Sequence, residues 1–292
     1  MPMNTHHPRP VKVIGVASGL GAQDPGTADG PRLLRELKVF QGGAAHATWE
    51  GMLRPASGHT SPVEAISELC SRIAHRVESD LATGKFPLVI GGDHSCAIGT
   101  WSGARQWLGA PLGLIWVDAH MDSHTFATSP SRAVHGMPLA ALLGYGEPVL
   151  TSIESDFPKL RPEHVCLLGV RSYEEGEAAL LKKLGVRVIG MDEVRRLGVP
   201  AAMAAAMAVA RNGTAGYGVS IDLDVLDPGE EPGVGSPAPN GIYCSELEQA
   251  LRQLRDDPAM LAMEIVEYNP HRDRDHLTAN AAGALFRAAM GG

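Results

Sequence analysis

The sequence predicts an α/β fold in which strands and helices alternate and the strands form a mostly parallel sheet. Apolar runs of strand length recur along the chain, and each run ends in polar or glycine-rich residues. Within the runs the apolar residues are continuous rather than alternating, which is typical of strands buried on both faces of a parallel sheet. Helical patterns separate the runs. This alternation predicts a layered α/β fold.

Seven of these runs are expected to form strands. In chain order they cover residues 11–17, 87–90, 112–117, 164–169, 186–189, 217–221 and 261–266. Each contains mainly valine, isoleucine, leucine or small residues, and each is followed by residues that favour turns.

The clearest helix is expected to begin at Ser61. Ser61 is a preferred N-cap residue, Pro62 suits the first helical position, and Glu64 occupies the capping-box position. Apolar residues then recur at a spacing of three to four over 63–81, and Gly84 can end the helix. Residues 245–248, Ser-Glu-Leu-Glu, carry a second capping-box signal and predict another helix.

Composition places the chain among ordinary globular proteins. It has 292 residues, 44% of them hydrophobic, and its 25 basic against 33 acidic residues give a formal charge of −8. A chain of this size can bury a large core without disulfides, and its acidity disfavours a dedicated nucleic-acid binder. No repeat or linker-like tract is evident. We therefore expect one domain over residues 1–292, with residues 1–10 as a flexible N-terminus.

No targeting or membrane segment is recognisable. The first ten residues lack the apolar stretch of a signal peptide, and no window approaches the length of a spanning helix. The cysteines are scattered without a Cys-x-x-Cys pair, as expected for reduced thiols; they are Cys70, Cys96, Cys166 and Cys244. These features predict a cytoplasmic protein without a membrane partner.

Acidic residues and histidines gather where four of the predicted strands end. These ends are followed by Gly-Gly-Asp-His-Ser at 91–95, Asp-Ala-His-Met-Asp at 118–122, Asp-Leu-Asp at 222–224, and a glutamate at 267. In parallel sheets the carboxyl ends of the strands face the ligand crevice. The coincidence of position and residue type predicts a metal site whose candidate ligands are His94, Asp118, His120, Asp122, Asp222 and Asp224.

The spacing of these candidates has a mechanical basis. If the backbone stays nearly extended, Asp118, His120 and Asp122 point to the same side and can reach one point. Two imidazoles and four carboxylates are too many ligands for one tetrahedral zinc ion, and so many oxygen atoms suit manganese better. The set therefore favours two metal ions close together. Taken alone, Asp222 could be a turn former and His94 a core histidine, and Asp93 is expected to orient a ligand or cap a helix.

The motifs resemble those of the ureohydrolase (arginase/agmatinase) family, and they are closest to its arginase branch. The similarity rests on 91–95, 118–122, His-Gly at 135–136 and 220–228, which follow the family's order. It extends from about residue 13 to about residue 289. This resemblance implies a three-layer α/β/α fold, a centre of two Mn²⁺ ions per subunit, hydrolysis of a guanidino group to urea and an amine, and a homotrimer or homohexamer.

The resemblance also implies roles for individual residues. His135 is similar to the family's proton-shuttling histidine, and Glu267 to the glutamate that pairs with the guanidinium. Asp122 is expected to orient the attacking water as well as bind metal. Ser236 is at the position of a small hydroxyl residue that lines the guanidinium pocket. The loop residues expected to contact the rest of the substrate are His124, Ser131, Glu174 and Glu177.

The substrate is the least determined part of this interpretation. In arginases two asparagines and a serine recognise the α-carboxylate and α-amine of the substrate. This chain has His124 and Ala133 at the asparagine positions and keeps Ser131, and Glu174 preserves an acidic position that recognises the α-amine. His124 could supply a hydrogen-bond donor in place of asparagine or reshape the pocket. L-Arginine is the first expectation, and agmatine, guanidinobutyrate and N-hydroxyarginine are the nearest alternatives.

Other protein classes fit the sequence less well. A binuclear phosphoesterase would carry a Gly-Asn-His-Glu motif, which is absent. A metal-dependent deacetylase of similar fold would need one zinc ion and a His-His dyad, and the only such pair is His6-His7 at the terminus. A non-catalytic subunit remains an alternative, but loss of ligands would favour it and all six are present.

Overall fold

The computed structural model describes residues 9–41 and 47–291, so most of the segment expected to be a flexible N-terminus lies outside it. Within these residues, eight parallel strands form one sheet in the order β2-β1-β3-β8-β7-β4-β5-β6. The strands are β1 (Val11–Val16), β2 (Ala47–Leu53), β3 (Phe86–Gly91), β4 (Leu112–Val117), β5 (Val165–Val170), β6 (Arg187–Gly190), β7 (Gly216–Asp222) and β8 (Met260–Val266). The predicted α/β class and parallel sheet are confirmed.

The central strands are the ones that the continuous apolar pattern predicts. Every residue of β3, β4, β5, β7 and β8 is buried, as expected for strands covered on both faces. The edge strand β2 was not predicted. Its sequence, ATWEGML, is only partly buried, so it lacks a continuous apolar run.

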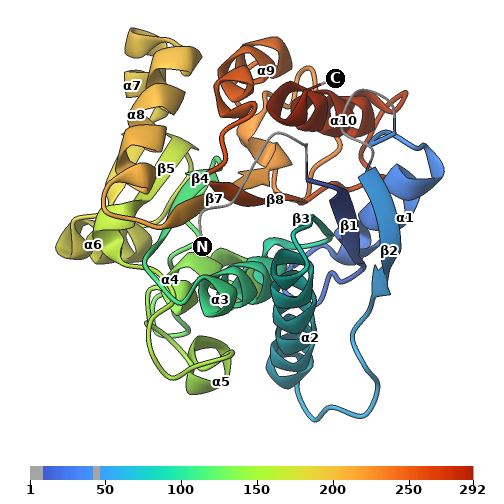
Figure 1. The fold of residues 1–292 in the computed structure, drawn as a ribbon, viewed down its shortest axis with the longest axis vertical. Helices are drawn as coiled ribbons and strands as arrows, with labels where there is room; N and C mark the ends of the chain where they lie inside the picture. The colour runs from blue at the N-terminus through green and yellow to red at the C-terminus, as the bar shows by residue number, and fades with distance from the viewer. Residues whose placement is uncertain (1–8, 42–46, 292) are drawn as a thin grey trace.

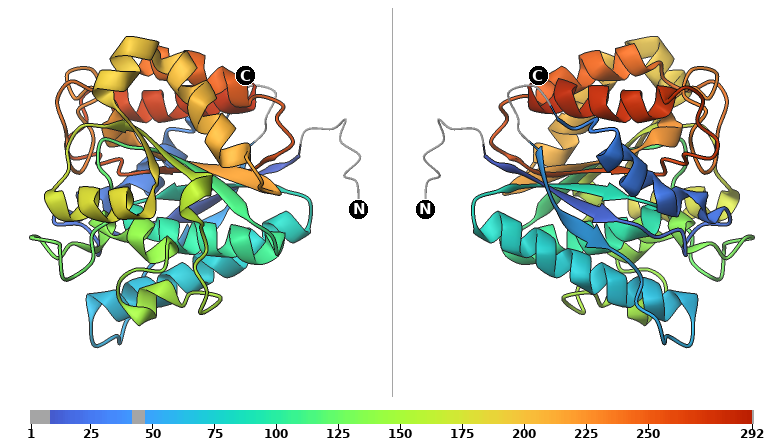
Figure 2. Two further views of the ribbon diagram at one scale, coloured as in Figure 1. Left: turned by 90° about the vertical axis from the view of Figure 1, so that its left-hand side faces the viewer. Right: turned by 90° about the vertical axis from the view of Figure 1, so that its right-hand side faces the viewer.

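Helices cover both faces of the sheet, which gives three layers (Figures 1 and 2). One face is covered by α1 (Gly30–Glu36), α7 (Met191–Leu197), α8 (Val199–Arg211), α9 (Cys244–Leu251) and α10 (Leu277–Met290). The other is covered by α2 (Pro62–Ala82), α3 (Ala97–Leu108), α4 (Pro138–Leu142) and α6 (Glu175–Leu184), with the short α5 (Pro148–Thr151) packed outside α2. The three-layer arrangement expected from the resemblance is thus present.

The helix signals hold with small changes. Ser61 caps α2 by accepting a hydrogen bond from the Glu64 amide, and the Glu64 side chain returns to the Thr60 amide, one residue before the expected partner. Gly84 follows the end of α2 with a positive φ, as predicted. The predicted cap at Ser245 is wrong, because α9 begins at Cys244 and Tyr243 is its N-cap.

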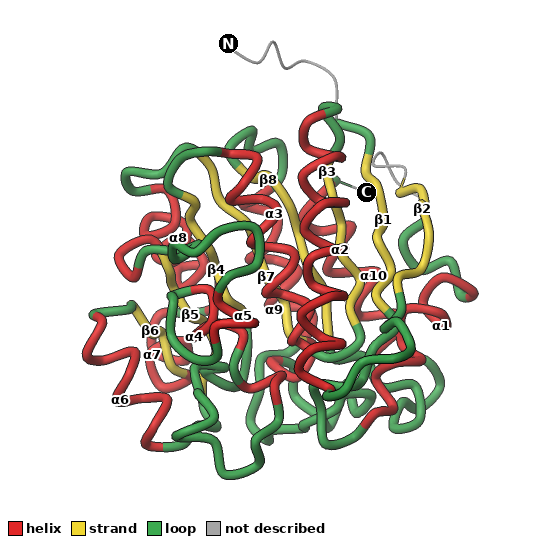
Figure 3. The backbone as a smooth tube through the Cα atoms, turned by 90° about the horizontal axis from the view of Figure 1, so that it is seen from below, coloured by secondary structure: helices red, strands yellow, loops and turns green. Residues whose placement is uncertain are grey.

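The parallel arrangement places all strand carboxyl ends at one edge of the sheet. Figure 3 shows the long loops gathered at that edge. The four central strands, in the spatial order β3-β8-β7-β4, therefore present their following loops side by side. No helix in the described part of the chain combines the length and apolarity needed to cross a membrane.

Candidate metal centre and active site

The predicted ligands converge although they come from distant parts of the sequence. His94 lies in a turn after β3, Asp118 directly after β4, and Asp222 at the end of β7. The turn at His94 is held by Asp93, whose carboxylate accepts hydrogen bonds from the amides of Ser95 and Gly21, each at 3.0 Å. Asp93 is thus a cap, as expected. The sheet order, rather than the chain order, brings these loops together.

One group of ligands surrounds His94. Its Nδ1 atom lies 3.0 Å from an oxygen of Asp122, 3.2 Å from one of Asp222 and 3.4 Å from one of Asp118. The ring is 1% exposed and stacks on Trp116 with a centroid separation of 4.2 Å. Three carboxylates thus meet one imidazole nitrogen in a buried space.

A second group shares Asp118 with the first. Nδ1 of His120 lies 3.0 Å from Asp224 and 3.6 Å from the other oxygen of Asp118. The described residues contain three groups that could hold a metal ion. One is His124, Glu174 and Glu177; the two that meet at Asp118 are His94, Asp118 and Asp222, and Asp118, His120 and Asp224. Because Asp118 directs one oxygen toward each group, the arrangement matches two neighbouring cation positions with a bridging carboxylate.

The Asp-Ala-His-Met-Asp segment lacks the nearly extended backbone that the spacing argument assumed. The strand ends at Val117, the chain bends at Ala119 and His120, and Asp122 has a φ of 48°. The segment is therefore not nearly extended. Asp122 reaches the site because the chain turns back, which the alternation argument did not foresee.

The site holds more negative charge than its histidines balance. Burial and the charge of Asp118 raise the pKa of Asp122 to about 6, and burial together with neighbouring carboxylates raises the pKa of Asp222 and of Asp224. The Nδ1 atom of His94 is buried and has no hydrogen-bond partner among the described residues. Divalent cations fit a carboxylate cluster of this kind with a free imidazole nitrogen. They would offset the repulsion among the buried carboxylates and give the imidazole nitrogen a partner.

Glu267 and His135 form a pair beside this cluster. Oε1 of Glu267 accepts a hydrogen bond from the His94 amide at 2.9 Å and lies 3.0 Å from Nδ1 of His135. Oε2 of the same carboxylate is buried and has no hydrogen-bond partner in the part of the chain that the structure describes, and a methyl group at Gly235 would collide with it. Burial disfavours the charged imidazole, but Glu267 outweighs it and raises the pKa of His135 to about 9.

The outer wall of the site is built by His124 and two glutamates. Nε2 of His124 lies 2.9 Å from Glu174 and 3.4 Å from Glu177, and its Nδ1 lies 3.1 Å from the Thr128 hydroxyl. His124 is 5% exposed, whereas the Glu174 side chain is 60% exposed. Burial raises the pKa of Glu177 to about 8. The wall thus combines one hydrogen-bond donor with two acceptors.

These groups surround a cavity of about 110 Å³. Within the described chain, its lining includes five carboxylates and no lysine or arginine; it comprises His120, Asp122, His124, Pro130, Ser131, His135, Gly136, Glu174, Glu177, Asp222, Asp224 and Ser236. Ser131 is at the rim, where its Oγ accepts a hydrogen bond from the Ala133 amide. Ser236 and His135 also line a neighbouring cavity of about 380 Å³. The 110 Å³ cavity is bordered by all the predicted site residues except Glu267, His94 and Asp118, which are buried and do not line it.

Sequence reasoning missed four residues that support the site. Trp116 donates to Asp118 at 2.8 Å, Ser220 is 2.9 Å from Nε2 of His94, and Glu264 is 2.8 Å from Ser220. Arg171 donates to the backbone carbonyls of Asp224, Val225 and Leu226 and so holds the loop after β7. The available signal was Glu264, because an acidic residue within an otherwise apolar strand requires a buried partner.

Comparison with known proteins shows which protein family has this fold and this set of motifs. A family model described as "Arginase family" matches residues 9–291. The chain is 38% identical to an arginase of Bacillus caldovelox, covering 97% of this chain and 98% of that one. It is 37% identical to an arginase of Brevibacillus brevis, covering 96% and 97%. A crystal structure of arginase from Bacillus subtilis superposes with a TM-score of 0.91 at 34% identity, covering 97% of this chain and 99% of that one.

Proposed function

Because the chain belongs to the arginase family and is an amidinohydrolase, we propose that it hydrolyses L-arginine to L-ornithine and urea. The observation that supports this best is Glu267, a buried carboxylate beside the cluster of six candidate metal ligands, of which one oxygen has no partner within residues 9–41 and 47–291. A guanidinium ion is planar and can donate paired hydrogen bonds to a carboxylate. The arginases to which the chain is similar support the choice of arginine.

We propose that two Mn²⁺ ions occupy the centre. Asp118 would bridge them, with His94, Asp122 and Asp222 on one side and His120 and Asp224 on the other. The oxygen-rich donor set supports manganese over zinc. When bound, these ions supply the Lewis acidity that makes water a nucleophile near neutral pH.

The chain's own residues would then perform binding, orientation and proton transfer. Glu267 holds the guanidinium through its free oxygen and keeps the guanidinium carbon over the carboxylate cluster. Asp122 accepts a hydrogen bond from the attacking water and orients it. When the bond between carbon and the substrate's chain nitrogen breaks, that nitrogen needs a proton. His135, whose raised pKa keeps it protonated at neutral pH, is placed to supply it.

The outer wall supports an α-amino acid as the substrate. Such a substrate carries an ammonium and a carboxylate on one carbon atom. Glu174 and Glu177 can accept hydrogen bonds from the ammonium. Ser131 can donate to the carboxylate, and His124 can do so when its Nε2–H exchanges Glu174 for the substrate. Agmatine lacks the carboxylate, and guanidinobutyrate lacks the ammonium. Agmatine would therefore contact only the two glutamates, and guanidinobutyrate only His124 and Ser131.

A panel of guanidino compounds tests the proposed activity. Arginine, agmatine, guanidinobutyrate and N-hydroxyarginine are each incubated with the protein and Mn²⁺, or Ni²⁺ for comparison, and urea is measured. Arginine should give the highest kcat/KM, and His135→Ala should lower its kcat. Absence of urea from every compound would refute the proposed function, and undiminished turnover of His135→Ala would remove the role of that residue alone.

A single substitution tests the role of the wall. His124→Ala should raise KM for arginine by roughly 10-fold to 100-fold, because it removes a hydrogen bond to a charged group. Agmatine serves as the matched control, since it has no carboxylate to lose. Equal effects on the two substrates would show that His124 does not recognise the carboxylate.

We also propose that the chain acts as a single domain in a homotrimer or homohexamer in the cytoplasm. The extent of the family match over 9–291 supports one domain, since one sheet carries all the motifs. Light scattering coupled to size-exclusion chromatography gives the assembly mass, and a mass equal to 30.8 kDa would contradict the oligomer.

A further inference from the structure

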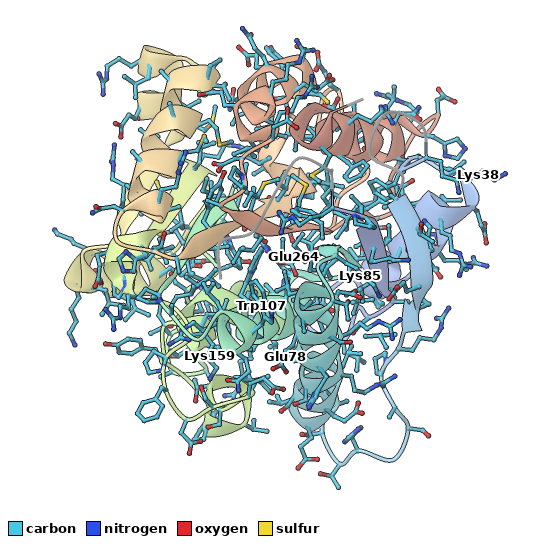
Figure 4. The ribbon with its side chains drawn as sticks, viewed as in Figure 1. Lys38, Glu78, Lys85, Trp107, Lys159 and Glu264 are labelled. Atoms are coloured by element: carbon cyan, nitrogen blue, oxygen red, sulfur yellow. The ribbon has the colours of Figure 1, made fainter. Side chains whose placement is uncertain are left out.

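A buried acid lies behind the metal ligands and takes no part in the proposed chemistry. Glu264 is in the middle of β8 and is 0% exposed. Figure 4 shows it beneath the β8 ribbon, toward the face of the sheet that carries α2 and α3. A carboxylate in such a place is costly unless hydrogen bonds satisfy it. The identity of its donors therefore indicates what it does.

Three side chains donate to Glu264. Ser220 is its cross-strand partner on β7 and donates to Oε1 at 2.8 Å. Thr100, from α3, donates to Oε2, and the Cys96 thiol lies 3.6 Å from the same atom. The two carboxylate oxygens thus have different partners, and Oε1 is directed to Ser220.

The Ser220 hydroxyl connects Glu264 to His94. Nε2 of His94 lies 2.9 Å from Ser220 Oγ. A hydroxyl has one proton, and a carboxylate can only accept, so the Ser220 proton points to Glu264. Ser220 must then accept from Nε2–H of His94. With Nε2 protonated, the neutral ring presents its lone pair at Nδ1. This atom faces Asp118, Asp122 and Asp222 and has no hydrogen-bond partner in the described chain.

We propose that Glu264 is a positioning residue that sets the tautomer of His94 through Ser220 and thereby prepares Nδ1 to bind a cation. Without an acceptor at position 264, the Ser220 proton is free to turn toward Nε2. The ring would then carry its proton on Nδ1, where it blocks coordination. Glu264 acts as an oriented acceptor rather than as a charge, and this distinction makes the inference testable. It rests on the proposed cation centre.

The test compares two substitutions of Glu264 in the full-length chain. Glu264→Met removes the acceptor at nearly equal volume and should weaken Mn²⁺ binding by roughly 10-fold to 100-fold. Glu264→Gln removes the charge but can keep its carbonyl toward Ser220 and its amide toward Thr100, so it should bind Mn²⁺ nearly as tightly as the parent. Affinity is measured by calorimetric titration of Mn²⁺ into metal-stripped protein.

Thr100→Val is the matched control. It removes another donor to the same carboxylate but leaves the connection to His94, so Mn²⁺ affinity should not change. In Zn²⁺-loaded protein labelled with ¹⁵N-histidine, the Nε2–H proton of His94 should show a hydrogen-bonded, downfield resonance in the parent and in Glu264→Gln. The resonance should be lost in Ser220→Ala.

Each result decides the inference. Unchanged Mn²⁺ affinity in Glu264→Met, or an equal loss in Glu264→Met and Glu264→Gln, would overturn it. If Glu264→Met does not fold, Ser220→Ala takes its place and should weaken binding to a similar degree, and unchanged affinity there would also overturn the inference. A parent protein that binds neither Mn²⁺ nor Zn²⁺ would refute the proposed centre and this inference with it. A parent that binds Mn²⁺ but is unaffected by these substitutions leaves the proposed function intact.

Discussion

At the scale of single residues, Glu267 bears costs that a structural role does not explain. Its backbone φ is 65°, in the left-handed region that side chains other than glycine rarely adopt. Glu267 is 1% exposed, and one of its carboxylate oxygens has no hydrogen-bond partner among the residues that the structure describes. Strain and unsatisfied polar atoms of this kind persist at sites where a ligand uses them. Both features are consistent with a carboxylate that binds a cationic group of the substrate.

The substitution Glu267→Gln should reduce kcat/KM for the guanidino substrate by at least about 100-fold, because it removes the charge from the pair with the guanidinium. Urea release measured over a range of substrate concentrations gives this value. Glu231→Gln provides a control, because it makes the same chemical change at a buried glutamate outside the site. Normal kinetics in Glu267→Gln would exclude the assigned role.

Glu231 itself has a predictable effect on stability. It is buried, its Oε2 lacks a hydrogen-bond partner in the described part of the chain, and burial together with nearby acids raises its pKa to about 7. The folded state therefore holds this proton between about pH 4.5 and 7, where the unfolded state has released it. The free energy of unfolding therefore decreases as the pH rises through that window.

Glu231→Gln should therefore stabilise the protein by about 1–2 kcal/mol at pH 8 and have little effect below about pH 5. Denaturant unfolding of the two proteins at several pH values measures the difference. A stability difference that does not change with pH would show that ionisation of the buried Glu231 carboxyl group does not destabilise the folded protein.

At the scale of secondary-structure elements, the contact between α2 and α3 depends on a lack of side chains. A Cβ atom at Gly103 would lie 2.7 Å from the Cα of Ala74 and even closer to the Ala74 carbonyl oxygen. Gly99 makes an equally close approach to Cys70. Glycine in a helix costs stability, so its presence here reflects the close packing of the helices. This packing orients α3, which begins directly after the His94 turn.

Gly103→Ala should destabilise the protein by about 1–3 kcal/mol, because the added methyl group forces the two helices apart. In an exposed helix the same substitution would stabilise. Gln106→Ala, at an exposed position of the same helix, is the control and should be nearly neutral. Thermal unfolding measures both variants, and a Gly103→Ala protein as stable as the parent would contradict the packing argument.

At the scale of the whole molecule, the carboxylate cluster couples folding to cation binding. Its ligands follow β3, β4 and β7, so the metal site draws together loops on both sides of the sheet centre. In the unfolded chain these residues are far apart and bind a cation weakly. Cations should therefore stabilise the folded state by mass action.

Removal of divalent cations with a chelator should lower Tm by roughly 5–10 °C relative to protein with Mn²⁺ at about 100 times its Kd, and added Mn²⁺ should restore it. Differential scanning calorimetry measures the shift. Asp118→Asn should respond far less, because Asp118 belongs to both ligand groups. A Tm that does not depend on Mn²⁺ would argue against the centre.

The sequence by itself determined the α/β class, most of the strands and the identity of the candidate ligands. These features are local. A strand buried on both faces shows a continuous apolar run, and a residue that directly follows such a run lies at the carboxyl edge of the sheet. The edge strand β2 was missed for the same reason, since partial burial leaves no such run.

Only the tertiary structure decided which residues act together. Glu264 contacts Ser220 because β8 pairs with β7. Strand β8 also pairs with β3, and this places His94, which follows β3, next to Ser220. These pairings bring segments about 170 residues apart into one cluster. The turn at Asp122 likewise depends on its surroundings rather than on strand alternation. Strand order and loop conformation minimise the energy of the whole chain, so the hydrogen bonds that prepare His94 and Glu267 cannot be inferred from local sequence patterns.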